Sequence, residues 1–390
     1  MGCVLHSRCE VRRLCHCGGC NRHFRHRRFS HVASKSKRHR VRLQLDGLLV
    51  LDLSRAVAGP HAGMMLGDLG ARVIKIESPG GDDSRQWGPP FVEGESTYFL
   101  SVNRNKESVI VDLKTDAGRE VFDALVARAD VLIENFSTGT MARLGFSEER
   151  LRELNPRLVV LSITGFGHDG PEAARPGYDQ IAQGEAGLMS VTGSSPTDPQ
   201  RVGVPISDVL AGLYGAFGIM AALYERERTG VGSIVRTSLL AATVGAHVYQ
   251  GTAQTVANHT GHARGNHHPS LAPYGLFRTG DGMVQIAVGN DRHWQALRAT
   301  LDLDDDSRFS ENRDRVVNHA ELVTFLETAL AQHESATLLE QLDKAGVPAG
   351  RIRTMDEVYA WDQTRSQGLV VTVEHESLGE IEIPGPALRF

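Results

Sequence analysis

Segments rich in branched aliphatic residues alternate with segments of helical periodicity from Leu45 onward. Strands buried on both faces of a parallel sheet are nearly continuous in aliphatic residues, whereas the covering helices carry one apolar stripe. The order of these patterns predicts a doubly wound, Rossmann-like α/β domain. Its strands are expected at 48–54, 71–77, 130–136 and 157–167, and its helices at 61–71, 121–129 and 147–154, with Pro60 opening the first helix and Ser147 capping the last.

The first crossover of this domain reads AVAGPHAG (56–63). It lacks the GxGxxG fingerprint with which dinucleotide-binding domains hold a pyrophosphate. We therefore expect neither a nicotinamide nor a flavin, and no other tightly bound cofactor.

The second half of the chain predicts a smaller α+β domain. It follows a long helix from Ser207 to Arg228, in which small residues (Gly212, Gly215, Ala216, Gly218 and Ala222) favour close packing of another backbone. A polar loop is expected at 251–273, a hairpin around Thr279–Gly282, helices at 291–301, 320–332 and 335–345, and strands from there to the C-terminus. The predicted division is a basic leader at 1–44, a large domain at 45–235, a linker and small domain at 236–350, and a return segment to the large domain at 351–390.

Charge is distributed unevenly around a formal net charge of −5. Residues 1–45 hold 12 of the 42 basic residues and one of the 47 acidic residues, which leaves 30 basic and 46 acidic residues in the body. An acidic body argues against a nucleic-acid partner. No apolar run approaches the roughly 20 residues that cross a bilayer, so we expect no membrane insertion.

The five cysteines all lie in the leader, so a cysteine nucleophile is excluded from the body. CHCGGC (15–20), with His23 and His26, has the residue types of a zinc site but no second ligand pair at a finger-like spacing, and no metal site is predicted. The leader has no periodic apolar face and is predicted to be disordered. Its Arg-rich, acid-poor composition also fits an organelle transit peptide, and a start site assigned too far upstream is a third interpretation. We expect a cytoplasmic protein, or an organelle-matrix protein if the leader is a transit peptide.

Several motifs in the body follow one another in a recognisable order. After the strand–crossover–strand segment that begins at Leu45 come STYFLSVNRNKESVIVDLK (96–114), ADVLIENF (129–136), ITGFGHDGPEAARPGYD (163–179) and GNHHPSLAPYGLFRT (265–279). Together they resemble the class III CoA transferases, the formyl-CoA and carnitine-CoA transferase group, as far as Phe390. Segment 82–106 is most similar to the branch that uses succinyl-CoA and dicarboxylates such as glutarate. The resemblance implies CoA transfer from an acyl-CoA such as succinyl-CoA to a carboxylic acid, with coenzyme A and acyl-CoA as substrates, in an interlocked homodimer.

The resemblance places the catalytic nucleophile on Asp208. The family's catalytic aspartate follows a Thr-Gly pair, here Thr192-Gly193, and opens a helix rich in small residues. A carboxylate there faces the positive end of the helix dipole, so we expect it to stay ionised at neutral pH and to attack a thioester carbonyl. On the residues alone, an aspartate that merely caps the helix is the alternative.

The resemblance also implies a set of substrate contacts. Loop 259–269, with Gly265, would supply backbone donors to the developing oxyanion. Arg85 and Arg104 are candidates for binding the second carboxylate of a dicarboxylic acceptor, the alternative being that they fasten loops or the dimer interface. Lys114 and Arg143 can neutralise phosphates of CoA. The other CoA contacts implied are Val57, Ala58, Val111, Asn135, Phe136, Ser137, Arg175, Pro176, Gly177 and Tyr178.

Two other functions are weighed against transfer. α-Methylacyl-CoA racemases of the same superfamily use a histidine and an aspartate on opposite sides of the α-carbon. Here Tyr178 stands at the histidine position and Arg278 at that of an assisting glutamate, and a tyrosine with a pKa near 10 is a poor base at neutral pH. Transfer is therefore favoured over racemisation. A catalytically silent acyl-CoA-binding protein is the third alternative.

Overall fold

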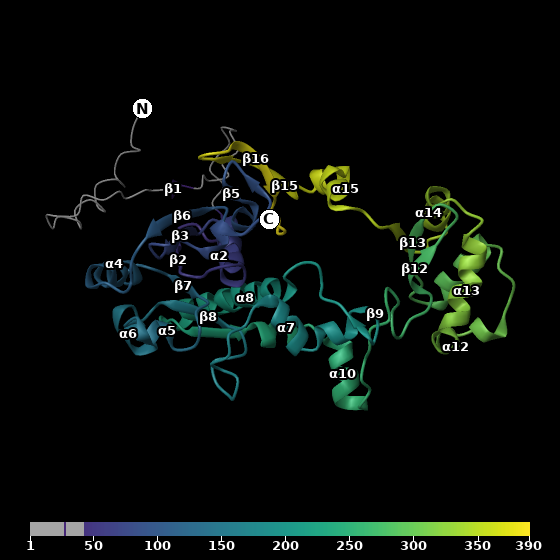
Figure 1. The fold of residues 1–390 in the computed structure, drawn as a ribbon, viewed down its shortest axis with the longest axis horizontal. Helices are drawn as coiled ribbons and strands as arrows, with labels where there is room; N and C mark the ends of the chain where they lie inside the picture. Colours follow the sequence, from purple (N-terminus) through teal and green to yellow (C-terminus); the bar gives the residue numbers. More distant parts are fainter. Residues whose placement is uncertain (1–26, 29–42) are drawn as a thin grey trace.

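A seven-stranded sheet forms the centre of the large domain (Figure 1). The computed structural model describes residues 27–28 and 43–390. All neighbouring strands are parallel except β1, which runs antiparallel to β6. The order is β1 (Arg27–Arg28), β6 (Lys106–Ile110), β3 (Arg72–Glu77), β2 (Leu49–Asp52), β7 (Val131–Glu134), β8 (Val159–Thr164) and β11 (Ile234–Ser238).

The order of these strands confirms the doubly wound prediction. From β2 the chain steps outward through β3 and β6, then returns to β7 on the other side of β2 and continues through β8 and β11. The winding direction therefore reverses between β2 and β7, and open α/β sheets bind their ligands at such a point, beyond the carboxyl ends of the strands. The four predicted strands correspond to β2, β3, β7 and β8. Residues 1–26 and 29–42 of the predicted leader, which include all five cysteines, lie outside the described residues.

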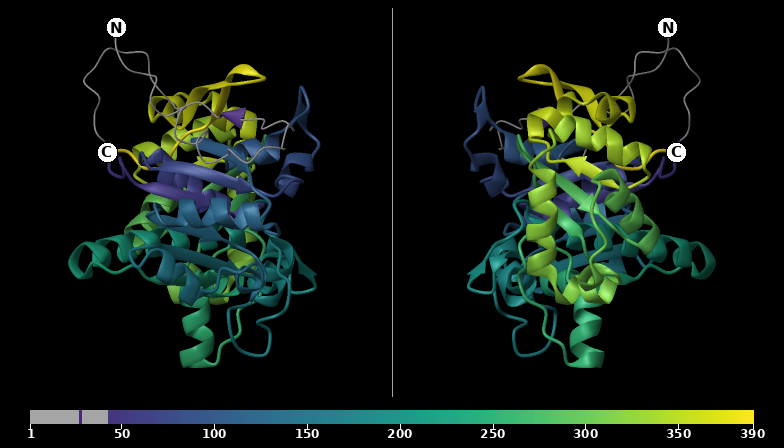
Figure 2. Two further views of the ribbon diagram at one scale, coloured as in Figure 1. Left: turned by 90° about the vertical axis from the view of Figure 1, so that its left-hand side faces the viewer. Right: turned by 90° about the vertical axis from the view of Figure 1, so that its right-hand side faces the viewer.

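Helices cover both faces of the sheet (Figure 2). Alternate strand residues point to opposite layers, so Val131 and Ile133 pack with one set of helices and Leu132 with the other. The first set is α2 (Ala58–Asp68), α7 (Asp179–Glu185), α8 (Ile206–Thr229) and α9 (Leu239–Gly245), and the second contains α4 (Asp116–Val126) and α6 (Glu148–Leu154). Shorter elements are η1 (Asp83–Gln86), α3 (Thr97–Ser101), α5 (Thr140–Arg143), η2 (Leu188–Val191) and the two-stranded pairs β4 (Phe91–Val92) with β5 (Glu95–Ser96) and β9 (Gly193–Ser195) with β10 (Asp198–Pro199).

The ends of these helices test the capping predictions. Ser147 caps α6, as predicted, by accepting a hydrogen bond from the Arg150 N–H. The first helix begins at Ala58, so Pro60 is its third residue rather than its first. α4 begins earlier than predicted because Thr115 caps it, accepting from the Gly118 N–H.

α8 confirms the predicted long helix but corrects the expectation that no segment is long and apolar enough to cross a membrane. By length and composition alone, Ile206–Thr229 meets that test among the described residues. A helix in the core of a globular protein passes it equally, and α8 packs against α2, β8, β11 and α9. The absence of a membrane partner stays a prediction.

Small residues let α8 approach α2 closely, as its composition predicted. A Cβ added at Gly212 would lie 2.7 Å from the Ala58 carbonyl oxygen and 2.9 Å from Nδ1 of His61. Asp208 is one turn before Gly212 on the same face of α8. The close contact at Gly212 therefore puts Asp208 on the side of α8 that faces α2.

We expect Gly212→Ala to destabilise the protein by about 1–3 kcal/mol, because the added methyl group meets backbone and must push the two helices apart. The measurement is the midpoint of urea unfolding. Gly184→Ala in α7 is the matched control, since its methyl group would make an ordinary contact at 3.6 Å with Sδ of Met189. The control should be neutral or slightly stabilising, because alanine is the better helix former. Equal stability of the two variants would contradict the close approach.

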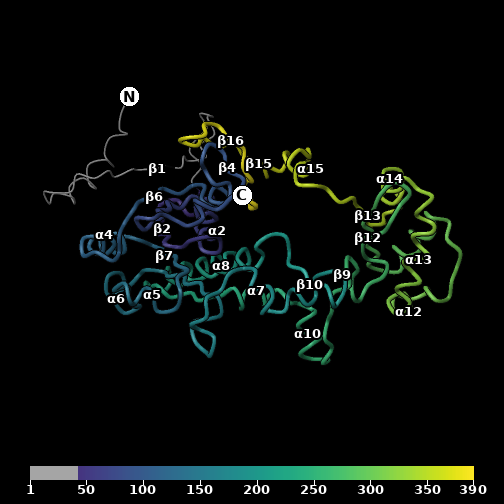
Figure 3. Tube along the Cα trace, viewed as in Figure 1, coloured from purple at the N-terminus to yellow at the C-terminus, as the bar shows by residue number. Residues whose placement is uncertain are grey.

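A second hydrophobic core lies at the far end of the molecule from the sheet (Figure 3). Its three-stranded sheet is β12 (Tyr274–Arg278), β13 (Met283–Ala287) and β14 (Ala349–Arg351), and its helices are α11 (Asp291–Thr300), η3 (Ser307–Phe309), α12 (Asn312–Val317), α13 (His319–Leu330) and α14 (Ser335–Lys344). The predicted hairpin and three predicted helices are confirmed. The polar loop expected at 251–273 is wrong in its first part, because α10 (Val248–Ala257) is helical.

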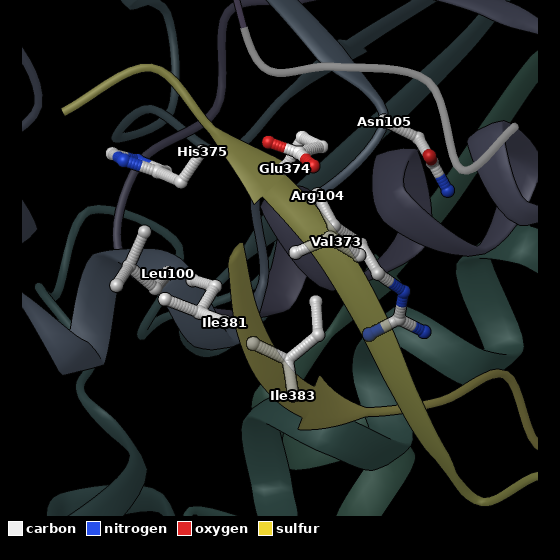
Figure 4. A pocket seen from close by; sticks show the side chains of 8 residues that line it. All are labelled: Leu100, Arg104, Asn105, Val373, Glu374, His375, Ile381 and Ile383. Carbon is white, nitrogen blue, oxygen red and sulfur yellow. The ribbon is translucent and has the colours of Figure 1, made fainter. Parts of the chain in front are cut away.

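The C-terminal segment returns to the large domain (Figure 1). It contains α15 (Met355–Ala360), α16 (Asp362–Ser366) and the antiparallel pair β15 (Val370–His375) and β16 (Gly379–Pro384). The two helices were not predicted, since strands were expected from 345 onward. The hairpin lies beside α3, and a small pocket between them is lined by Leu100, Arg104, Asn105, Val373, Glu374, His375, Ile381 and Ile383 (Figure 4). The exact domain boundaries stay a prediction.

Candidate active site

Asp208 occupies the first turn of α8, as predicted. It does not cap the helix: the residue before the helix is Pro205, and no side chain caps this end. The Asp208 side chain is partly buried. The capping alternative is therefore not what the structure shows.

The surroundings of Asp208 raise its pKa to about 7. Burial is the larger cause, because it disfavours the charged carboxylate, and the negative charge of Asp179 adds to it. The expectation that the helix dipole keeps Asp208 fully ionised at neutral pH is corrected by this result. Near pH 7 Asp208 is therefore expected to be partly protonated and partly in the nucleophilic carboxylate form.

Asp179, the first residue of α7, fixes the start of α8. One of its oxygens accepts a hydrogen bond from the Ser207 N–H at 2.9 Å, and the other accepts from Nε2 of Gln183 at 2.8 Å. On the other side, Oγ1 of Thr243 donates to Oγ of Ser207 at 2.8 Å. Ser207 is fully buried. The backbone that carries Asp208 is thus held from both α7 and α9, a role that sequence reasoning missed.

Tyr98 of α3 is a second residue linked electrostatically to Asp208 that sequence reasoning missed. Burial raises its pKa to about 12, and the negative charges of Asp208, Asp179 and Asp82 contribute. Its ring packs edge-on against Trp87, with the ring centroids 5.0 Å apart. The hydroxyl therefore stays protonated at any working pH and can act only as a neutral hydrogen-bond donor or acceptor.

The structure brings together the first crossover and the turn after β7, two of the segments predicted to contact CoA. The side-chain amide of Asn135 binds both backbone groups of Arg55: Oδ1 accepts from the Arg55 N–H and Nδ2 donates to the Arg55 carbonyl, each at 2.8 Å. Glu134 accepts from the Phe136 N–H at 2.9 Å. Val57 and Ala58, in the first crossover, are buried. The amide of Asn135 is therefore used to join the two segments.

The other predicted CoA contacts lie around the same edge of the sheet. Segment 175–178 packs on the end of β8, where Gly177 contacts Gly165 so closely that neither could carry a side chain. Thr138, in the β7 turn, donates to the carbonyl of Ala173, just before this segment, at 2.7 Å. Beyond β6, Val111 is buried and Lys114 is exposed. Three predicted contacts remain. Ser137 and Arg143 both form hydrogen bonds with Thr140, and Arg175 pairs with Glu185.

Two buried lysines form hydrogen bonds with backbone carbonyls at the first crossover. Nζ of Lys75 donates to the Ser54 carbonyl and pairs with Asp82, and Nζ of Lys106 donates to the Pro60 carbonyl and pairs with Asp52, all at 2.8 Å. Burial lowers the pKa of Lys106 to about 8, although Asp52 favours its charged form. The crossover is thus fixed at both ends by charges that are not accessible to a substrate.

Both arginines proposed for the acceptor already have carboxylate partners. Arg85 pairs with Glu77 at 2.6 Å and stacks over the ring of Phe99. Arg104 pairs with Asp68, whose side chain is 9% exposed, and donates to the Pro384 carbonyl at 3.1 Å, beside the return hairpin (Figure 4). These contacts favour the alternative in which the arginines fasten loops, and their binding of an acceptor stays a prediction.

Gly265 lies against β9 rather than α8. Its N–H donates to the Gly193 carbonyl at 2.8 Å, and its φ of 63° is in the left-handed region that favours glycine. The Thr192-Gly193 pair and loop 259–269 are therefore in contact. Among the residues that the structure describes, no group of three His, Cys, Asp or Glu could hold a metal.

The two positions that separate transferases from racemases lie in different parts of the fold. Tyr178 precedes α7, with 67% of its surface exposed. Arg278 ends β12 in the second core, where its N–H donates to Glu327.

Comparison with known proteins identifies the family. A family model described as "CoA-transferase family III" matches residues 45–390. Human succinyl-CoA:glutarate CoA-transferase is 40% identical over 350 residues, which cover 89% of this chain and 80% of that protein. The acetyl-CoA:oxalate CoA-transferase of Acetobacter aceti is 41% identical and covers 88% of both chains.

Solved structures agree with this result. A CAIB/BAIF family protein from Brucella suis superposes with a TM-score of 0.79 at 41% identity, covering 90% of this chain and 93% of that one. Rv3272 from Mycobacterium tuberculosis has a TM-score of 0.79 at 34% identity, covering 89% and 93%. The motifs, the doubly wound sheet and these matches agree, and the chain belongs to CoA-transferase family III.

Proposed function

We propose that this enzyme transfers CoA from an acyl-CoA such as succinyl-CoA to a dicarboxylic acid, with Asp208 as the nucleophile. Related enzymes named for succinyl-CoA with glutarate and for acetyl-CoA with oxalate support the substrate class. The observation that carries the mechanism is the state of Asp208: a partly buried carboxylate at the start of a helix, with a pKa of about 7 and no hydrogen bond to another described side chain. Such a group is poorly solvated and is therefore reactive once ionised.

The reaction begins when an oxygen of Asp208 attacks the thioester carbonyl of the donor. The carbon–sulfur bond breaks, which releases CoA thiolate and leaves an acyl-aspartyl anhydride. The thiolate then attacks the Asp208 carbonyl carbon, forming an aspartyl-CoA thioester and releasing the donor acid.

The acceptor carboxylate attacks this thioester, giving a second anhydride and free thiolate again. Attack of the thiolate on the acceptor's acyl carbon yields the new acyl-CoA and restores Asp208. One thioester is used and one is made, so no other energy source is needed. Backbone donors and the protonated Tyr98 hydroxyl are the groups available for oxyanion charge that develops near Asp208.

A panel of acyl-CoA donors and carboxylate acceptors, followed by mass spectrometry of the CoA products, tests the proposed function. We expect succinyl-CoA with a dicarboxylate such as glutarate to give the fastest exchange. Hydroxylamine added during turnover should convert the aspartyl thioester to a hydroxamate that peptide mapping finds on Asp208. A silent acyl-CoA-binding protein would bind donor without forming this adduct, and a racemase would exchange the α-proton without moving CoA.

We also propose that the enzyme is a homodimer in which a second copy covers an apolar stripe on α8. The α8 stripe consists of Leu213, Phe217, Met220 and Tyr224, spaced so that they share one face of the helix. Phe217 is 75% exposed and Tyr224 is 70% exposed, and contiguous exposed apolar surface of this kind marks protein interfaces. A second copy is the natural occupant because most soluble oligomers pair identical surfaces. In Figure 1 the chain leaves the large domain for the second core and returns through the C-terminal segment, which is compatible with an interlocked arrangement.

Phe217→Glu is expected to convert the dimer to monomer or to reduce its association at least about tenfold, because a charge buried at an interface without a partner is costly. Light scattering during gel filtration measures the change. Val121→Glu, on the exposed side of α4, is the control and should leave the mass unchanged. A wild-type protein that is monomeric at every concentration would contradict the dimer.

A further inference from the structure

Arg55 lies where the winding of the sheet reverses. It belongs to the crossover that follows β2, and β7 is the strand next to β2 on the other side of the reversal. Ligands of open α/β sheets bind in this crevice, at the carboxyl ends of the strands. The side chain of Arg55 was not among the predicted substrate contacts.

The backbone of Arg55 is held in one conformation. Asn135 binds its N–H and its carbonyl at the same time, as described above. The next residue, Ala56, has a φ of 63°, a left-handed conformation that alanine rarely adopts and that the surrounding contacts must enforce. The side chain of Arg55 therefore projects from a fixed backbone, so only side-chain order has to be gained when its guanidinium binds a ligand.

The guanidinium itself has only a weak partner. Its Nη1 lies 3.2 Å from Oδ2 of Asp83, and these side chains are 51% and 67% exposed. Its Cζ lies 5.8 Å from the ring centroid of Phe136. An exposed ion pair of this kind contributes between nothing and about 1 kcal/mol.

Four other cations near this edge differ in this respect, whereas Lys114 and Arg143 are exposed like Arg55. Lys75, Lys106, Arg85 and Arg104 each pair with a carboxylate that is 9% exposed or less. Removing any of them from its partner would leave a buried charge uncompensated. Arg55 can exchange its carboxylate for a ligand at little cost.

We propose that Arg55 binds a phosphate group of the ADP moiety of coenzyme A and that Asp83 competes for it. The planar guanidinium fork matches two phosphate oxygens, and Phe136 supports its flat face. α2 begins three residues later and adds the positive end of its dipole to the same region. The inference rests on the proposed function, because it presumes that CoA is the ligand of this edge.

Calorimetric binding of CoA, dephospho-CoA and pantetheine to the full chain tests this inference. Arg55→Gln should raise the Kd of CoA about ten- to a hundredfold, as expected for the loss of a charge-assisted hydrogen bond, and should leave pantetheine binding unchanged. If Arg55 contacts the 3′-phosphate, the variant loses the difference between CoA and dephospho-CoA. If it contacts the pyrophosphate, the variant weakens both equally.

Asp83→Asn is expected to change the Kd of CoA in the opposite direction. Removing the competing carboxylate should tighten CoA binding about two- to fivefold at low salt. Arg72→Gln is the matched control, because Arg72 forms an exposed ion pair with Glu107 at the start of β3, on the opposite edge of the sheet. It should change no Kd.

Two results would overturn the inference while leaving the proposed function intact. One is a wild-type enzyme that transfers CoA and an Arg55→Gln variant with unchanged Kd for CoA. The other is an equal loss for CoA and pantetheine, which would mean that the substitution disturbs the crossover rather than a phosphate contact. A wild-type protein that binds no CoA would count against both.

Discussion

Asp208→Asn is expected to reduce CoA transfer to less than about 1% of the wild-type rate while CoA still binds. The amide keeps the shape of the side chain but cannot form the anhydride, so the covalent route is lost. The predicted CoA-binding segments, at the carboxyl ends of β2 and β7, are untouched by the substitution. Initial rates with succinyl-CoA and glutarate, together with the Kd of CoA, measure the two expectations separately.

Asp302→Asn is the matched control for this substitution. Asp302 is exposed and has a φ of 49°, which asparagine adopts readily. The control should keep full activity. Transfer above about 1% of wild type in Asp208→Asn or in Asp208→Ala would assign the chemistry to another residue, and hydroxylamine trapping would then locate it.

The central sheet could be predicted from the sequence because its strands are buried on both faces. Aliphatic runs such as those of β2 and β7 have few other interpretations. α10 could not be predicted in the same way, since none of its residues is buried. α9 was missed for a related reason, because seven residues of mostly small side chains give too short a periodic signal.

The candidate site likewise contains one residue that the sequence indicates and others whose relation to it appears only in the fold. Asp208 was found through the resemblance, because a helix-start aspartate has many structural explanations. Asp179 and Tyr98 acquire their electrostatic relation to Asp208 only through the fold, since both are far from it in the sequence. The contact between Asn135 and the Arg55 backbone joins residues 80 positions apart, and no local pattern indicates it.

The ionisation of Asp208 shows why a local rule was not sufficient. The helix dipole favours a charged carboxylate by roughly 0.3–1 kcal/mol near the surface. Burial opposes it, the adjacent charge of Asp179 adds to the opposition, and the result is a pKa of about 7. The sequence indicates the helix end but does not show how deeply the side chain lies.

Asp208→Asn is also expected to make the inactive protein more stable than wild type at pH 8, by about 1–2 kcal/mol. The folded-state pKa of Asp208 is raised from 3.8 to about 7, so the folded protein disfavours the ionised form that the unfolded chain carries freely. The stability penalty is absent below about pH 4, grows as the pH rises towards 7 and is constant above that. The full shift would correspond to roughly 4 kcal/mol, and partial exposure together with the buried amide of the variant reduces the gain.

Urea unfolding of both proteins at pH 4.5, 6 and 8 measures this effect. The difference in the free energy of unfolding should be small at pH 4.5 and should increase with pH, because only the wild type gains a disfavoured charge. Asp302→Asn should show no comparable increase, since its side chain is exposed. A difference that stays constant across the three pH values would mean that the amide alters packing rather than charge. It would also contradict a raised pKa for the nucleophile, and with it the conclusion that this enzyme holds a reactive carboxylate at a cost in stability.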